Sequence, residues 1–188
     1  MERIAIAGIS LHDTDVGSLE RVARPRDGEH SRFLLDLADD LAASEVVLLA
    51  TCNRVEVIFA RETGHFPGRP DLGVIADYLG LPEADPLRAR LRLWTGRDAA
   101  RHLFRVASSL DSVVLGEDQI IAQVRAGFAL SEERSACEGD SAQVVRACLD
   151  HMTQTFASSE STACLVQLAY CAGDWMCAAR EEGLSQVG

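Results

Sequence analysis

Lysine is absent from this sequence: all eighteen basic residues are arginine, and 29 acidic residues outnumber them. The formal net charge is therefore −11. Because non-specific binding to nucleic acid depends on neutralising phosphates, this balance excludes a protein that binds nucleic acid over its whole surface. Any nucleic-acid partner must meet a local patch of arginines, whose guanidinium groups grip phosphate and carboxylate in two-pronged geometry.

Long apolar runs and paired cysteine motifs are also missing. No stretch approaches the roughly 18 apolar residues of a membrane helix, and the first residues, MERIAIAG, lack the basic start and apolar core of a signal peptide. No CxxC pair or Cys/His ligand spacing occurs, so the sequence predicts neither a metal site nor disulfides. We expect a cytoplasmic protein with six free thiols.

What is present is an alternation of strand-like and helix-like segments. Period-2 apolar patterns predict strands at residues 3–9, on both sides of a turn within 46–59, and at 87–93. Helical spacing predicts a helix over 31–41 and another that starts with Asp71 as its N-cap. This order indicates an α+β fold: a ferredoxin-like antiparallel sheet with helices on one face, followed by a helical subdomain.

Arginine alternates with apolar residues in the last of these strands. Arg88, Arg90 and Arg92 would share one face of it, and Arg97 and Arg101 follow closely. That basic face is the best local candidate for a phosphate contact. The alternative is an edge strand that its charges keep soluble.

The helical pattern from Asp98 onward contains a break at Gly116 before a second helix. Gln119 and Gln123, four residues apart, share a polar face of that second helix.

We divide the chain into an α+β sandwich at 1–96, a helical part at 97–135 and an atypical helical tail at 136–188. The tail holds five of the six cysteines but only two of the eighteen arginines.

The polar tetrapeptide Thr51, Cys52, Asn53 and Arg54 separates the two strands within 46–59. Asparagine favours a tight turn there, since its side chain bonds local backbone. A thiol at such a turn is carried to the surface of the sheet, where the Arg54 cation would favour the thiolate. These residues suit a nucleophile, and the alternative is a buried structural cysteine beside an asparagine turn.

Two long motifs then point to one family. The segments VVLLATCNRVEV and LWTGRDAARHLFRVASSLDSVVLGEDQIIAQVRAGF resemble the N-terminal catalytic domain of glutamyl-tRNA reductase over about residues 3–135. That family catalyses the NADPH-dependent first step of five-carbon tetrapyrrole (porphyrin) synthesis. The resemblance implies that a cysteine attacks the ester of glutamyl-tRNA, forms a thioester and releases tRNA, and that hydride from NADPH then yields glutamate-1-semialdehyde.

The resemblance also assigns roles to individual residues. Cys52 matches the family's nucleophile, and His102 matches its active-site histidine, which polarises the carbonyl or assists proton transfer. Without the motif, a core histidine would be the expectation at position 102. The positions that match the family's substrate contacts are Thr51, Asn53, Arg54, Ser112, Glu117, Asp118, Gln119 and Gln123. Arg54 is the natural partner for a substrate carboxylate.

The match has departures. The usual GISHKTAP opening reads GISLHDTDV, so Leu11 replaces a polar residue, and we assign no chemistry to the neighbouring His12. Ser109 and Ala122 stand where glycine is usual, and Asp118 stands where proline is usual.

Past residue 135 the sequence has no KRVRTET-like basic helix and no Gly-rich GxGxxG fingerprint. We therefore expect that this chain does not bind NADPH in the family's way.

Two functions remain open. The first is a truncated or frameshifted glutamyl-tRNA reductase that keeps the Cys52 acylation site and has at most esterase activity. The second is a non-catalytic domain that binds glutamyl-tRNA or regulates a full-length reductase by pairing with it. The expected partners are glutamyl-tRNA and, among proteins, a downstream aminomutase or a full-length reductase, with no membrane.

Overall fold

A computed structural model describes residues 4–22, 29–61, 67–108, 110–111, 119–133 and 146. Its strands are β1 Ile4–Ser10, β2 Glu45–Ala50, β3 Arg54–Ala60 and β4 Arg92–Thr95. Its α-helices are α1 Val16–Glu20, α2 His30–Asp40, α3 Arg69–Tyr78, α4 Gly96–Ala107 and α5 Gln119–Glu133, and a 3₁₀ helix, η1, covers Pro86–Arg90. Among these helices none combines the length and apolarity needed to cross a bilayer.

The four strands form one antiparallel sheet in the order β2-β3-β1-β4. Two βαβ-like halves, β1-α2-β2 and β3-α3-β4, interleave in this order, which is the ferredoxin-like arrangement. The predicted α+β class is thereby confirmed, and so is the strand-turn-strand reading of residues 46–59. The central strands β1 and β3 are buried along their whole length, which means that both faces of the sheet are covered.

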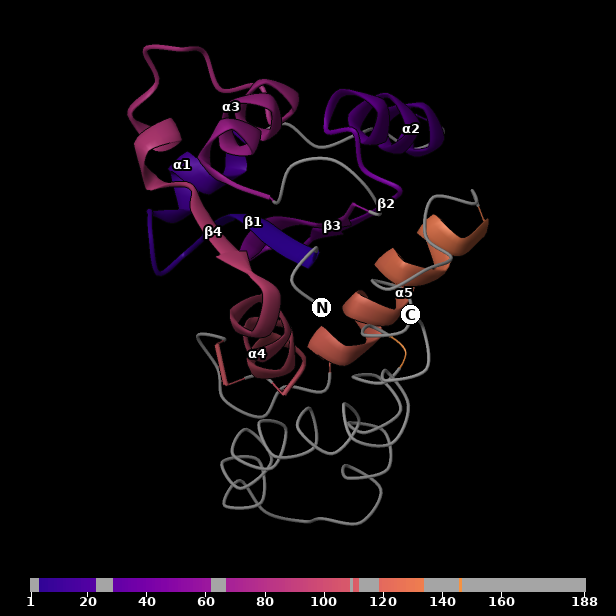
Figure 1. Cartoon of the computed structure of the whole chain (residues 1–188). Helices are drawn as coiled ribbons and strands as arrows, with labels where there is room; N and C mark the ends of the chain where they lie inside the picture. Colours follow the sequence, from indigo (N-terminus) through magenta and orange to yellow (C-terminus); the bar gives the residue numbers. More distant parts are fainter. Residues whose placement is uncertain are drawn as a thin grey trace.

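Helices cover the two faces in two groups (Figure 1). On one face, Leu34 and Leu37 of α2 and Ile75 of α3 pack with odd-numbered side chains of β3 such as Val57. On the other face lie α4 and α5, the predicted helical subdomain, which share a core with even-numbered positions of β1 and β3. The predicted boundaries at 96/97 and 135/136 stay predictions, and the tail apart from Arg146 lies outside the described residues.

The predicted strand over 87–93 is wrong in its first half. Pro86 presets a helical φ, and the Asp85 carboxylate accepts a hydrogen bond from the Leu87 N–H at 2.9 Å, so the chain makes the 3₁₀ turn η1 instead. Leu87 and Leu91, one turn apart, are both buried by this turn. Only residues 92–95 remain as strand β4.

This change removes the basic strand face. Arg88 on η1 donates to the Asp77 carboxylate and to the Leu81 carbonyl, and Arg90 donates to the Asp13 carbonyl. Arg92 forms an ion pair with the carboxylate of the same Asp13. Arg88 is therefore tied to α3 and the residues after it, whereas Arg90 and Arg92 are both tied to Asp13, so the three side chains do not form one phosphate-binding row.

The start of α3 also differs from the prediction. Gly68, not Asp71, is the N-cap, and Asp71 lies at the third helical position. From there its carboxylate accepts the Gly68 N–H at 2.7 Å and pairs with the buried Arg61 at 2.5 Å. Asp71 thus still satisfies the open end of the helix, but from inside the first turn.

Candidate functional site

The turn between β2 and β3 is held by its own hydroxyl group. Thr51 Oγ1 accepts hydrogen bonds from the backbone N–H groups of Asn53 and Arg54, each at 3.2 Å. The loop after β1 binds the turn from the other side, through a 2.9 Å bond from the Leu11 N–H to the Asn53 carbonyl. The Cys52 thiol at the tip is free and exposed, which rules out the buried structural alternative for this residue.

Arg54 begins β3 and points to the face of the sheet that α4 and α5 cover. Its side chain is only 1% exposed. Its Nη1 donates to Glu56 Oε1 and to Asp111 Oδ2, each at 3.1 Å, and its Nη2 donates to the Asp111 carbonyl. The Arg54 Nε is also buried, and within the described part of the chain it has no hydrogen-bond partner. The carboxylates of Glu56 and Asp111 are therefore already bound to the Arg54 guanidinium, which is the group predicted to bind a carboxylate of the substrate.

His102 lies in the middle of α4 and is 6% exposed. Its Nε2 is 2.9 Å from Glu56 Oε1. Its ring stacks on the Trp94 indole, with centroids 3.7 Å apart and an angle of 7° between the planes. His102 is thus buried like a core histidine, yet its polar atoms belong to a charged network that also contains Arg54.

Asp111 ties this network to the loop after β1. Besides Arg54, its carboxylate faces Arg105 at 3.8 Å, and its carbonyl oxygen is 3.3 Å from His12 Nε2. Burial opposes ionisation of this carboxyl, but the charge and hydrogen bond of Arg54, with further help from His102 and His12, hold the pKa of Asp111 below its ordinary value. The Asp111 side chain is therefore a fixed anion at neutral pH.

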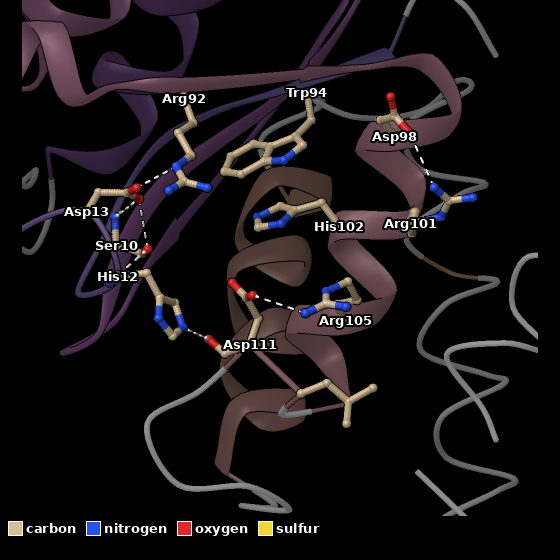
Figure 2. Close-up of a pocket in the computed structure, with 11 residues that line it drawn as sticks. Ser10, His12, Asp13, Arg92, Trp94, Asp98, Arg101, His102, Arg105 and Asp111 are labelled. Carbon is tan, nitrogen blue, oxygen red and sulfur yellow. Dashed lines mark hydrogen bonds and ion pairs between the residues drawn. The ribbon is translucent and has the colours of Figure 1, made fainter. Parts of the chain in front are cut away.

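A cavity of about 500 Å³ opens beside this network. Figure 2 shows His12, Asp111 and His102 around it, with Trp94 stacked above the imidazole. The described residues that line it are Ser10, His12, Asp13, Arg92, Trp94, Asp98, Arg101, His102, Arg105, Leu110 and Asp111. Three arginines face three aspartates there, which suits a ligand with charges of both signs or a chain of phosphates met by the arginines.

The structure brings together some of the predicted site residues. Arg54 and His102 meet through Glu56, and the turn formed by Thr51, Cys52 and Asn53 adjoins them through the chain, although the turn residues do not line the cavity.

Among the remaining predicted positions with a described side chain, no hydrogen bond or ion pair joins Gln123 to this network. Gln123 is half-buried on α5, and Gln119 begins that helix. Ser112, Glu117 and Asp118 lie outside the described residues.

Several residues of the site were not predicted from the sequence: Glu56, Trp94, Asp111 and His12 in the network and beside it, and Asp13, Asp98 and Arg105 among those that line the cavity. Glu56 carried a signal, because a carboxylate at an inward position of an otherwise apolar central strand requires a buried partner. Asp111 and Trp94 lie within the motif that carries the family resemblance. His12 carried no signal, since only the folded loop places it at the cavity.

Metal chemistry finds no support in the described ranges, where no group of three His, Cys, Asp or Glu side chains converges.

Comparisons with known proteins agree on one family. The family described as the glutamyl-tRNA reductase N-terminal domain matches residues 7–157. The chain is 33% identical over 132 residues to the glutamyl-tRNA reductase of Wolinella succinogenes, covering 70% of this chain and 30% of that protein. It is 39% identical over 137 residues to the glutamyl-tRNA reductase of Rubrobacter xylanophilus, covering 72% of this chain and 31% of that one.

A solved structure is similar as well. The glutamyl-tRNA reductase from Methanopyrus kandleri superposes with a TM-score of 0.67 and 26% identity, covering 85% of this chain and 35% of the solved one. The chain thus spans about a third of the length of the proteins it matches.

Proposed function

The chain belongs to the glutamyl-tRNA reductase N-terminal domain family, and from this premise we propose that it binds glutamyl-tRNA and accepts the glutamyl group on Cys52. One observation carries the proposal: the exposed Cys52 thiol stands at a turn that continues directly into Arg54, and Arg54 connects through Glu56 to His102 at the cavity wall. An exposed thiol on a turn that leads into a network with a buried, hydrogen-bonded histidine suits acyl transfer to sulfur.

The proposed reaction transfers an acyl group from oxygen to sulfur. Cys52 Sγ loses its proton and attacks the ester carbonyl, so that a carbon–sulfur bond forms as the carbon–oxygen bond to the tRNA ribose breaks. The departing ribose oxygen takes up one proton. The products are a glutamyl thioester on Cys52 and uncharged tRNA, and no oxidation or reduction occurs in this step.

The RNA contact moves from the predicted strand to helix α4. Arg97, Arg101 and Arg105 are spaced by four residues and are all exposed, and we call them the α4 arginine ridge. Arg101 and Arg105 also line the cavity. The Arg101–Asp98 ion pair is long, at 3.6 Å, and solvated, and the Arg105–Asp111 pair is longer still, at 3.8 Å, with the Arg105 side chain half-exposed, so phosphates can compete for these arginines.

The described residues do not fit NADPH. A dinucleotide is held by a Gly-rich turn between a parallel strand and a helix, whereas the strands here are all antiparallel and the turn from β4 into α4 has the single glycine Gly96. We therefore derive no hydride step from these residues. For the 188-residue chain assayed alone, we propose that water accepts the acyl group, which makes it a slow esterase that releases glutamate.

The test is to incubate glutamyl-tRNA with the chain, with and without NADPH, and to separate the products. We expect free glutamate and uncharged tRNA in both tubes. Cys52→Ser should remove the activity, because a serine hydroxyl without a strong base is a poor nucleophile. Semialdehyde formed only with NADPH would show the hydride part of the proposal to be wrong. Intact glutamyl-tRNA in both tubes would favour the alternative of a non-catalytic binding or regulatory domain.

A further inference from the structure

The imidazole of His102 is held from two directions. Glu56 binds its edge, with 2.9 Å between Nε2 and Oε1, and Trp94 covers its face in a nearly parallel stack at 3.7 Å (Figure 2). These two contacts remove different freedoms, because the hydrogen bond fixes the rotation of the ring in its plane and the stack fixes the plane itself. Neither Glu56 nor Trp94 belongs to the proposed substrate contacts.

The partners of Glu56 decide which nitrogen carries the proton. Glu56 Oε1 also accepts a 3.1 Å hydrogen bond from the buried Arg54 guanidinium, so this carboxylate lies beside a permanent cation and acts as an acceptor. His102 Nε2 must therefore be the donor in its own bond to Oε1. In the neutral imidazole the lone pair then resides on Nδ1.

Nδ1 is the nitrogen that remains for a ligand. Within the described part of the chain no group bonds His102 Nδ1, and this atom is not among the fully buried atoms that lack a partner. The ring itself lines the cavity. A reacting group in the cavity would thus meet the unprotonated nitrogen.

The supports of the ring are themselves fixed by the sheet. Glu56 of β3 lies opposite Gly8 of β1, where a Cβ would come within 2.6 Å of the Glu56 Cα, so the two backbones touch. Trp94 of β4 lies opposite Ile6 on the other side of β1. Three adjacent strands therefore set the positions of the two groups that hold the imidazole.

We propose that Glu56 and Trp94 are positioning residues that hold His102 as the Nε2-protonated imidazole, so that Nδ1 is the atom that moves the proton of acyl transfer. This inference rests on the proposed function. In the step, Nδ1 accepts one proton from the reacting groups in the cavity as Cys52 Sγ is deprotonated and the carbon–sulfur bond forms, and it donates one proton to the ribose oxygen as the ester carbon–oxygen bond breaks. The imidazole ends neutral, with its proton still on Nε2.

The first test needs no substrate. In the full chain labelled with ¹⁵N-histidine, and with His102→Gln to assign the signal, the neutral His102 ring should show a pyrrole-type Nε2 and a pyridine-type Nδ1. In Glu56→Leu, which removes the acceptor, a mixture of tautomers should appear. A pyridine-type Nε2 in the unchanged protein would overturn the proposal, whether or not the chain turns over glutamyl-tRNA.

The second test separates positioning from packing by kinetics on glutamyl-tRNA. Trp94→Leu and Glu56→Gln should each lower kcat roughly tenfold to a hundredfold, which is the size of effect expected from the outer partners of a functional histidine, with KM nearly unchanged. Trp94→Phe keeps a flat ring and should restore most of kcat. The matched controls are Phe33→Leu, a partly buried aromatic on the opposite face, and Glu45→Gln, a buried glutamate of β2.

The outcomes of the kinetic test are distinct. Equal losses in the controls, or a Trp94→Phe variant as slow as Trp94→Leu, would reduce the two residues to packing elements and overturn the proposal. If the unchanged protein leaves glutamyl-tRNA intact, the proposed function fails, and the tautomer measurement alone still decides whether Glu56 sets the protonated nitrogen.

Discussion

At the scale of single residues, the exposed Cys52 gives the most direct prediction. Its thiol is at the tip of a turn that backbone hydrogen bonds keep open to solvent. Brief alkylation at neutral pH, followed by peptide mapping, should label Cys52 before the other five cysteines. Earlier labelling of the cysteines at 137–188 would contradict this and would weaken the assignment of the nucleophile.

Asp111 provides a prediction about pH. Burial raises the pKa of Asp111, but Arg54 lowers it by more, so the pKa in the folded state lies below the ordinary value of 3.8. Ionised Asp111 therefore stabilises the fold at every pH above the pKa of the unfolded chain. This stabilisation is lost as the pH falls through the pKa of the folded state. Asp111→Asn should lower the free energy of unfolding at pH 7 by about 1–3 kcal/mol. Among the described residues, the buried Arg54 guanidinium forms ion pairs with Glu56 and Asp111, and the substitution removes the charge of the second partner.

Urea unfolding of both proteins at pH 7 and at about pH 3.5 checks this. The difference between them should shrink at the lower pH, where the Asp111 carboxyl of the unfolded chain takes up its proton. A difference that stays constant between the two pH values would show that the carboxylate charge is not what stabilises the fold.

At the scale of elements, the close pairing of β1 and β3 depends on Gly8. A Cβ there would lie 2.2 Å from the Val55 carbonyl oxygen and 2.9 Å from Glu56 Cγ, and backbone atoms of a central strand cannot move aside. Gly8→Ala should therefore destabilise the protein by about 3 kcal/mol or more, as overpacking of a core does. It should also displace Glu56 and with it the His102 imidazole.

Gly73→Ala is the matched control for this substitution. Gly73 lies inside α3, and a Cβ there would meet only the Arg88 Nη2 atom at 3.9 Å. Relative to glycine, alanine favours a helix by roughly 0.5–1 kcal/mol, so thermal unfolding should show a small gain in stability. Similar losses at both positions would argue against a special role for the close approach at Gly8.

At the scale of the whole molecule, the net charge of −11 opposes RNA, so binding must be local and sensitive to salt. Replacing Arg97 and Arg101 of the α4 arginine ridge by alanine should weaken tRNA binding. The slope of log affinity against log salt should fall by about 0.7–0.9 for each phosphate that the variant no longer neutralises. Filter binding over a range of salt concentrations measures both quantities.

Arg21 and Arg32 supply the control for charge. Their side chains are 58% and 88% exposed, and Arg32 lies on α2, on the face of the sheet opposite α4. The double alanine variant of Arg21 and Arg32 changes the net charge by the same amount as the variant of Arg97 and Arg101. It should leave the slope of log affinity against log salt unchanged. Equal weakening by the two double variants would mean that RNA responds to total charge and not to the ridge.

The sequence by itself determined the sheet, the turn and the family, because these depend on patterns within short stretches. Apolar runs on both sides of Thr51–Arg54 predict a hairpin without any knowledge of what packs against it. Period-3.6 spacing of apolar residues likewise predicts the helices α2 and α4. The prediction failed at 87–93, where the alternation of basic and apolar residues indicates a strand, but Asp85 and Pro86 just before it start a 3₁₀ turn.

Only the tertiary structure decided how the charged residues combine. Arg54 meets Asp111 across 57 residues of sequence, and Glu56 meets His102 across 46, because the chain folds α4 back over the face of the sheet that carries Arg54 and Glu56. No periodicity within one segment encodes such pairs. A buried charge requires a partner, which the sequence could indicate for Glu56, but the identity of that partner depends on which helix covers the strand.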